Sequence, residues 1–128
     1  DAKIFNTSCK FGVLICYDMI FPDVANVMTK KGAQILFSPS RIVKEGIVPW
    51  KMYVQVRSLE NRIPIVAVNV EDAKFGGNSL TVELVKENKI VKTKINELQG
   101  EYEKSTDITF SDYEEIRRNR FSDGNKFQ

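Results

Sequence analysis

The feature that most constrains this chain is an apolar run, residues 12–16, that ends in a cysteine and leads directly into a polar corner and Phe-Pro-Asp. The run reads GVLIC, and continuous apolar residues of this kind, with valine and isoleucine among them, predict a strand buried on both faces of a sheet. Pro22 fits the first turn of a helix that follows the corner. We therefore expect Cys16 near the carboxyl end of a central strand, where open α/β sheets place ligands and chemistry.

Cys16 has two interpretations at this point. A free cysteine in an apolar run is usually a small core residue, whereas a sharp strand-to-helix turn exposes nucleophiles in other folds. The chain contains no histidine, so a Cys-His or Ser-His-Asp apparatus within it is excluded. An activated Cys16 would need a carboxylate or a lysine as its proton partner. The second cysteine, Cys9, falls in the polar turn Asn-Thr-Ser-Cys-Lys and is expected to be a bystander.

Composition places the chain among single globular domains. It has 128 residues, 42% of them hydrophobic and 28% charged, which is ordinary for such a domain. The net charge is +2 and the basic residues are scattered, so we expect no nucleic-acid partner. No apolar run approaches the ~20 residues of a membrane helix, so we expect no membrane partner. Two cysteines do not make a disulfide framework, and the reducing cytoplasm is the expected compartment.

The order of the predicted elements indicates an α/β fold. A strand, a helix and a second strand follow one another with short joints, which implies a parallel pair of strands. Pro49 is expected to open the long helix after a loop. Ser111 and Glu114 are expected to form a capping box at the start of the last helix. The predicted strands are 3–6, 11–17, 33–37, 65–70, 79–85, 90–95 and 106–110, and the predicted helices are 23–31, 49–62 and 112–120.

Four segments of the chain, taken in order, resemble the nitrilase superfamily, the carbon–nitrogen hydrolases. The run GVLICYDMIFPD, residues 12–23, is similar to the family's cysteine motif. The other three are GAQILFSPS (32–40), similar to the family's next strand, the segment 50–69 with its tryptophan and VRSLENRIPIVAVN, similar to the family's Trp…R-A-x-E-N…N segment, and FGGNS (75–79), similar to its F-x-G-x-S loop.

The resemblance covers nearly the whole chain but only the second half of the family's domain. We therefore expect residues 1–128 to be the C-terminal half of such a domain, with the sheet, the helices and the cysteine site in 1–95 and a C-terminal extension in 96–128. The implied fold is α/β, a four-layer α-β-β-α sandwich whose two sheets are built from both halves. Since the chain starts at Asp1 in strand-like sequence, we expect it to be a segment of a longer protein or a processed one.

The resemblance also implies a mechanism. The family uses a Glu-Lys-Cys triad, and Cys16 matches its nucleophile, which would attack an amide carbon to form a thioester that water then hydrolyses. The backbone N–H of Tyr17 would donate to the tetrahedral oxyanion. The family's Glu and Lys lie upstream of Asp1, so we expect the isolated chain to be inactive and to need the N-terminal half as its partner. The resemblance implies no cofactor and no metal.

Five further residues are expected to orient the cysteine corner from behind it. They are Asp18, Arg57, Glu60, Asn61 and Asn69. Glu60 matches a framework position of the R-A-x-E-N segment, so it is not expected to act as the base. Arg57 and Glu60 are three residues apart on one predicted helix and can pair. The alternative is that such residues form only plain surface ion pairs, which contribute little.

The cysteine motif also bears on the substrate. Cys-Tyr-Asp, residues 16–18, resembles the amidase and carbamoylase branches more than true nitrilases, which tend to carry Cys-Trp-Glu. The implied substrate is a small non-peptide amide or a carbamoyl compound. Several relatives that bind a substrate carboxylate place an arginine just after this motif, where this chain has Met19 and Ile20. Arginine suits bidentate recognition of a carboxylate, so its absence argues against a carboxylate at that position.

Two other functions remain open. The chain could be a non-catalytic fragment or pseudo-enzyme domain that keeps the fold for assembly, or a stand-alone thiol protein. The thiol protein is disfavoured because no second cysteine or base is placed near Cys16 in the sequence. Half a sandwich would expose apolar faces and strand edges, so we expect pairing with the missing half or self-association. Family members are commonly dimers, so a homodimer or higher homo-oligomer, with the tail from Ser111 onward crossing the interface, is also implied.

Overall fold

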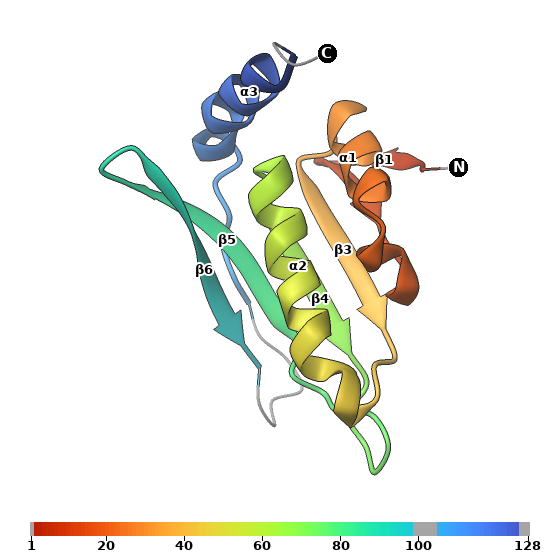
Figure 1. Cartoon of the computed structure of the whole chain (residues 1–128). Helices are drawn as coiled ribbons and strands as arrows, with labels where there is room; N and C mark the ends of the chain where they lie inside the picture. The colour runs from red at the N-terminus through yellow and green to blue at the C-terminus, as the bar shows by residue number, and fades with distance from the viewer. Residues whose placement is uncertain (1, 99–104, 126–128) are drawn as a thin grey trace.

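A computed structural model describes residues 2–98 and 105–125 of the chain (Figure 1). Within this part of the chain, six strands form one mixed sheet in the order β1-β2-β3-β4-β5-β6. The strands are β1 (Ile4–Asn6), β2 (Lys10–Val13), β3 (Ile35–Ser40), β4 (Ile65–Asn69), β5 (Leu80–Glu87) and β6 (Ile90–Glu97). The helices are the 3-10 helices η1 (Cys16–Ile20) and η2 (Lys44–Gly46) and the α-helices α1 (Pro22–Lys30), α2 (Ile47–Asn61) and α3 (Ser111–Asn125).

The middle of the sheet is parallel and both of its margins are antiparallel. β2, β3 and β4 run in the same direction, as the strand–helix–strand order predicts, whereas β1, β5 and β6 are antiparallel to their neighbours. The arrowheads of β3 and β4 therefore point to the same end of the strands, the lower end in Figure 1. We call this end of the sheet, with η1 and the loops that follow β3 and β4, the carboxyl edge.

Helices α1 and α2 lie in front of the sheet in Figure 1 and cover one of its faces. Leu36 of β3 and Ile65 of β4 are register partners and are fully buried on this covered face. The core also includes buried side chains from both helices and from η1. Its members are Leu14, Met19, Ala25, Met28, Ala33, Leu36, Ile47, Trp50, Val54, Ile63, Ile65, Ala67, Leu80 and Val82.

The opposite face of the sheet carries apolar side chains that the described residues leave partly uncovered. Phe5, Phe37 and Val68 are 47%, 36% and 55% exposed. The rings of Phe5 and Phe37 both contact the ring of Phe11, with centroid separations of 5.2 Å and 5.6 Å. We call Phe5, Phe11, Phe37 and Val68 the open face. The described chain thus supplies one sheet and the helical layer on one side of it.

Cys16 is not part of a strand, so the prediction of a strand over 11–17 is wrong at its carboxyl end. β2 ends at Val13, and the N–H of Leu14 still donates to the carbonyl of Phe37 at 2.9 Å. Cys16 then begins η1 with a φ of 50°. A left-handed residue cannot continue an extended strand, so the chain turns out of the sheet at the cysteine.

β3 continues through Ser40, although the sequence predicts that it ends at Phe37. The continuation passes through Pro39, which has no N–H to donate to a neighbouring strand. The carbonyl of Phe37 faces β2, so the backbone of Pro39, two residues on, faces the same side. β2 has already ended there, so the proline costs no hydrogen bond between strands.

Helices α1 and α2 confirm two predicted helices to within two residues. α1 begins at Pro22, as expected for proline at the first helical position. α2 begins at Ile47, so Pro49 lies in its first turn, where the N–H groups have no partner within the helix. The helix ends at Asn61, and Arg62 follows in the left-handed conformation with a φ of 52°.

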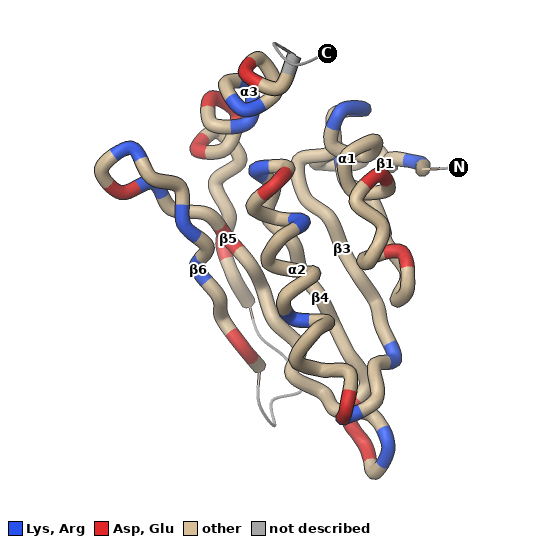
Figure 2. Tube along the Cα trace, viewed as in Figure 1, with Lys and Arg blue, Asp and Glu red and all other residues tan. Residues whose placement is uncertain are grey.

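The predicted hairpin near the end of the sheet is confirmed, and its strands are longer than expected. Asn88 and Lys89 connect β5 and β6 with φ values of 48° and 70°, the pair of left-handed residues that a type I′ turn requires. Figure 2 shows charged residues along β6, whereas β3 and β4 contain none. One side of the hairpin is therefore suited to contact with solvent, whereas β3 and β4 suit burial on both faces.

The strand predicted at 106–110 does not form. Residues 105–109 have no regular structure. Both edges of β5 are already paired, with β4 and with β6, so β5 offers this segment no free edge. The helix predicted at 112–120 is longer in the structure. It is α3, which includes Ser111 as its first residue, so Ser111 is not the N-cap that the capping box requires.

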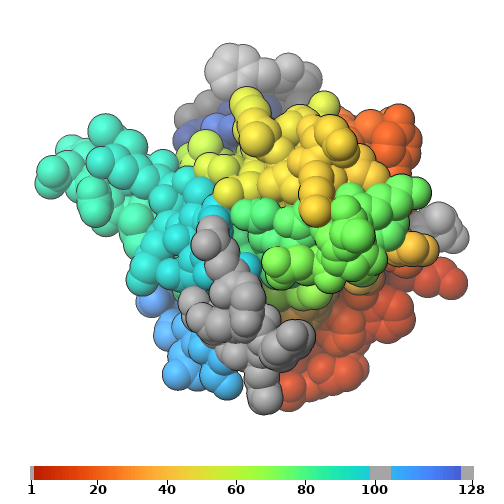
Figure 3. Space-filling model, turned by 90° about the horizontal axis from the view of Figure 1, so that it is seen from below, coloured from red at the N-terminus to blue at the C-terminus, as the bar shows by residue number. Residues whose placement is uncertain are grey.

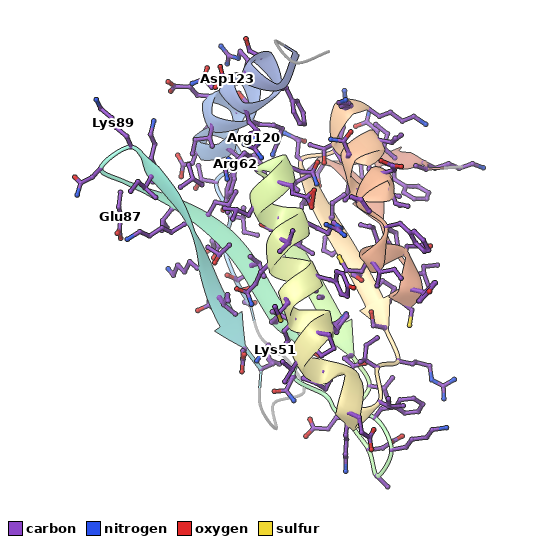
Figure 4. All side chains as sticks on the ribbon, in the orientation of Figure 1. Lys51, Arg62, Glu87, Lys89, Arg120 and Asp123 are labelled. Carbon is purple, nitrogen blue, oxygen red and sulfur yellow. The ribbon has the colours of Figure 1, made fainter. Side chains whose placement is uncertain are left out.

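The tail helix α3 packs on its own chain. Tyr113 is 4% exposed, and its hydroxyl accepts a hydrogen bond from the N–H of Leu84 at 3.2 Å. Burial raises the pKa of Tyr113 above its ordinary value. Arg117 donates from Nε to the carbonyl of Arg62 at 3.1 Å. Figure 4 shows Arg62 and Arg120 together where α3 meets the end of α2, and this proximity, after burial, lowers the pKa of Arg62.

Candidate active site

Cys16 stands at the turn between β2 and α1 in a conformation that costs free energy. Its φ of 50° lies in the left-handed region, which costs a residue other than glycine roughly 1–2 kcal/mol. Strained residues of this kind persist only where the surrounding structure fixes them, and they cluster at functional sites. Cys16 is half-buried and lies at the carboxyl edge.

Asp18 closes the corner around Cys16. Its carboxylate oxygen Oδ2 accepts a hydrogen bond from the N–H of Ile15 at 3.0 Å. Its own N–H donates to the carbonyl of Ile15, also at 3.0 Å. These two bonds hold the residues on either side of the cysteine, so the position of Asp18 suits the orienting role expected for it.

Arg57 ties η1 to α2 from the buried side. Its Nε donates to the carbonyl of Met19 at 3.0 Å and its Nη2 to the carbonyl of Ile20 at 2.9 Å. Its Nη1 pairs with the carboxylate of Glu60, the partner predicted from their spacing. Arg57 is only 6% exposed, so this is not the plain surface ion pair of the alternative interpretation. A hydrogen bond from a charged donor contributes about 1.5–3 kcal/mol, so Arg57 is a major brace of the corner.

Asn61 lies one step away from the corner. Its Oδ1 accepts a hydrogen bond from Nδ2 of Asn26 on α1 at 3.2 Å. Its Nδ2 donates to the carbonyl of Arg57 at 2.9 Å. Asn61 is buried and therefore joins α1 to α2. It acts on the corner only through these helices, and not on the cysteine directly.

Asn69, at the end of β4, connects two loops of the carboxyl edge. Its Oδ1 accepts from the N–H of Ile42 at 2.6 Å, and its Nδ2 donates to the carbonyl of Gly77 at 2.9 Å. Its backbone N–H donates to the hydroxyl of Ser79 at 2.9 Å. Asn69 therefore sets the position of the loop after β3 relative to the loop after β4.

Tyr17 places a backbone donor next to the cysteine. Its N–H lies in the first turn of η1, where helical N–H groups have no partner within the helix. This geometry leaves the donor available for an oxyanion formed at Cys16. The Tyr17 ring is 67% exposed and contacts the ring of Phe21 edge-on, with centroids 5.3 Å apart.

The loop of residues 71–79 packs against the start of α2. A Cβ atom added to Gly76 would clash with the side chain of Ile47, so this close approach requires glycine. Figure 3 shows the carboxyl edge from below, with this loop in green beside the yellow start of α2. The loop is thus a packed part of the edge that holds the candidate site.

Four residues that structure the site are not predicted from the sequence. They are Asn26, Arg41, Phe75 and Ser79. Phe75 and Ser79 belong to the FGGNS segment, so the resemblance marks their positions but not their contacts. Arg41 follows β3, and its guanidinium carbon lies 4.7 Å from the centroid of the Phe75 ring. No sequence pattern distinguishes Asn26, whose contact with α2 depends on the packing of the two helices.

Residues 2–98 and 105–125 contain neither a cluster of metal ligands nor a helix that could span a membrane. In this part of the chain, no group of three or more His, Cys, Asp or Glu side chains is arranged to hold a metal ion. No helix in the same residues is both long enough and apolar enough to cross a membrane.

Known proteins match the chain over most of its length. The family model described as carbon-nitrogen hydrolase matches residues 2–92. A probable nitrilase of Schizosaccharomyces pombe is 31% identical over 127 residues, which cover 95% of this chain and 45% of that protein. An N-carbamoylputrescine amidase of Arabidopsis thaliana is 39% identical over 75 residues, which cover 52% of this chain and 25% of that protein.

The fold also matches a solved structure. The carbon–nitrogen hydrolase from Helicobacter pylori G27 gives a TM-score of 0.62 at 25% identity, and the match covers 88% of this chain and 44% of that one. This likeness confirms the predicted α/β, nitrilase-like fold. The chain spans less than half the length of each of these relatives.

Proposed function

Because the chain belongs to the carbon–nitrogen hydrolase family, whose model matches residues 2–92, we propose that it carries the nucleophile, Cys16, of an enzyme that hydrolyses small amides or carbamoyl compounds. The family match confirms the resemblance seen in the sequence. The observation that carries the proposal is the strained Cys16 at the carboxyl edge, with a φ of 50° and two hydrogen bonds that join Asp18 to Ile15 across the cysteine.

The proposed reaction has two steps at the cysteine. The Cys16 thiolate attacks the carbonyl carbon, a C–S bond forms, and the C–N bond breaks as the nitrogen leaves as ammonia or an amine with an added proton. Water then attacks the thioester, which releases the acid and returns the thiol. The N–H of Tyr17 donates to the oxyanion in both tetrahedral intermediates. Arg57 and Asp18 hold the corner so that these groups keep their positions.

The proton carriers are proposed to come from the N-terminal half of the domain. The acids nearest the corner are already engaged, Asp18 with the N–H of Ile15 and Glu60 with Arg57. A base that exchanges protons with Cys16 must be free to do so. The open face is the proposed docking surface for that half, since its apolar side chains lack a cover among the described residues.

The test is ammonia release from a panel of small amides and carbamoyl compounds. It compares this chain with a version that includes an N-terminal half, which we call the complete domain, each with and without Cys16→Ser. We expect turnover only in the complete wild-type domain, and a loss of about 10³-fold or more in its Cys16→Ser variant. Cys9→Ser is the matched control and should keep full turnover.

The other results would change the proposal in defined ways. Turnover by the short chain that Cys16→Ser abolishes would show that an acid within this chain is the base. Equal turnover in wild type and Cys16→Ser would exclude Cys16 as the nucleophile. Silence of the complete domain on the whole panel would favour the assembly-only function, which the open face also fits.

We also propose a homodimer as the assembly. α2 presents an apolar stripe of residues four apart, Val48, Met52 and Val56, which are 71%, 61% and 46% exposed. Such a stripe suits packing against a second copy. Light scattering after size-exclusion chromatography should give a dimer of the complete domain and a monomer of its Met52→Glu variant. A Met52→Glu variant that stays dimeric would exclude this face.

A further inference from the structure

Arg41 follows β3, the strand next to β2, at the carboxyl edge that also holds the cysteine corner. Val13 of β2 is the register partner of Phe37 in β3, and these two parallel strands end at the same edge of the sheet, β2 at Val13 and β3 at Ser40. η1 also packs against β3. Because η1 begins at Cys16, this packing brings Cys16 and the segment that follows β3 to one edge of the sheet.

The Arg41 side chain has a defined support. Its guanidinium carbon lies 4.7 Å from the centroid of the Phe75 ring, within the range of a cation–π contact. Phe75 is itself held, because the carboxylate of Asp72 accepts the N–H groups of Lys74 and Phe75 at 2.7 Å and 2.9 Å. Stacking uses the flat face of a guanidinium and leaves its rim of N–H donors free.

The charge of Arg41 has no direct partner in the described residues. The ion pairs found in residues 2–98 and 105–125 are Lys51–Glu97, Arg57–Glu60 and Lys92–Glu87. Asp72 is the acid that senses Arg41. Its pKa is lowered chiefly by the two backbone hydrogen bonds, and Arg41 and Lys44 add a smaller attraction. The carboxyl edge thus holds an exposed, supported and unpaired guanidinium.

We propose that Arg41 is the substrate-binding residue that selects amides carrying a carboxylate a few bonds from the scissile carbonyl. This inference rests on the proposed function, in which the amide carbon sits at Cys16. The rim of a guanidinium binds a carboxylate through two parallel N–H···O bonds. Arg41 would supply, from the segment after β3, the cation that several relatives supply just after the cysteine motif. Met19 and Ile20 stand at that place in this chain, and neither carries a charge.

The test uses the alkylation of Cys16 and requires no hydrolysis. Two reagents, iodoacetylglycine and iodoacetylglycinamide, differ only in a carboxylate or a carboxamide. In each, the cysteine sulfur displaces iodide, a C–S bond replaces the C–I bond, and the thiol proton passes to buffer. The measured quantity is the ratio of the two rate constants at Cys16 in the complete domain. Cys9, in the same chain, is the internal control.

We expect Arg41→Met to lower this ratio at Cys16 about tenfold, the effect of one charge-assisted hydrogen bond, and Arg41→Lys to lower it less. The ratio at Cys9 should not change. Lys89→Met removes an equal charge at the hairpin tip, far from the carboxyl edge in Figure 4, and should change neither ratio. An unchanged ratio at Cys16 in Arg41→Met, or an equal fall at Cys9, would overturn the inference.

The same variants separate this inference from the proposed function. In the ammonia assay, succinamate and butyramide are amides with and without a carboxylate. The wild-type domain should prefer succinamate, and Arg41→Met should lose that preference at least tenfold in kcat/KM. Wild-type turnover without a preference for succinamate would overturn the role of Arg41 and leave the hydrolase standing. A fall in the alkylation ratio at Cys16 without turnover of any amide would support the role of Arg41 and overturn the hydrolase.

Discussion

In β3 and β4, both faces of the sheet carry apolar side chains, and the faces differ in what covers them. On the covered face, Leu36 and Ile65 are fully buried beneath α2. On the open face, Phe37, the next residue along from Leu36, is 36% exposed, and Val68 is 55% exposed. β3 thus contributes a buried side chain to the core on one face and carries a partly exposed apolar side chain on the other. The difference indicates that the covered face stabilises this chain, whereas the open face is suited to another layer.

The candidate site lies at the carboxyl edge, between the covered face and the open face of the sheet. The cysteine corner is braced from the covered side by Arg57, through the carbonyls of Met19 and Ile20. Its outer side, with the exposed ring of Tyr17, lacks such contacts among the described residues. This arrangement, with contacts on one side only, suits the proposal that Cys16 is a nucleophile whose site is completed by a second half of the domain.

The largest expected effect compares neighbouring residues on the two faces. Leu36→Ala should destabilise the chain by about 3–5 kcal/mol, because it leaves a cavity in a closed core. Phe37→Ala should cost only about 1–2 kcal/mol in the chain alone, since its ring is already partly in water. In the complete domain its cost should rise to about 3–5 kcal/mol. Urea denaturation of both variants measures these costs.

The control for this comparison is Val27→Ala, on the outer side of α1, where the side chain is 39% exposed. Its cost should be the same with and without the N-terminal half. If the cost of Phe37→Ala is also the same in the two proteins, the open face is not the surface on which that half docks.

The second effect concerns charged groups and compares a buried brace with an exposed pair. Arg57→Met should destabilise the protein by about 3 kcal/mol, because it leaves the buried carbonyls of Met19 and Ile20 without donors. Lys92→Met removes the cation of the exposed Lys92–Glu87 pair and should cost less than about 0.5 kcal/mol. Thermal unfolding at matched salt gives both values, and equal losses would mean that Arg57 is not a brace.

The smallest effect isolates the strain at the cysteine. Cys16→Gly and Cys16→Ala both remove the thiol, but only glycine adopts a φ of 50° without a steric cost. We expect Cys16→Gly to be about 1 kcal/mol more stable than Cys16→Ala. The difference in urea midpoints measures it. Cys16→Ala as the more stable of the two would mean that the corner is not strained.

The sequence predicts the elements that depend on local patterns. Apolar spacing and Pro22 locate α1, and the parallel order of β2, β3 and β4 follows from short joints around that helix. The ion pair of Arg57 with Glu60 follows from their spacing on one helix. These features hold because each depends on residues a few positions apart.

Other features are not predicted from the sequence, most of them because they depend on contacts between distant segments. Cys16 leaves the strand because Asp18 captures the N–H of Ile15, and an apolar run contains no sign of that turn. The stacking of Arg41 on Phe75 and the bond of Asn69 to Ser79 join loops that only the folded sheet brings together. The strand expected at 106–110 fails for the same reason, since its pairing depends on whether β5 has a free edge.

The central claim is that Cys16 forms the covalent bond to the substrate, and the most direct measurement is the mass of the protein during turnover. The complete domain is quenched in acid while it hydrolyses an amide, and its peptides are analysed by mass spectrometry. We predict the acyl mass on the peptide with Cys16, none on the peptide with Cys9, and none in Cys16→Ser. An acyl group on another residue, or undiminished hydrolysis by Cys16→Ser, would contradict the account.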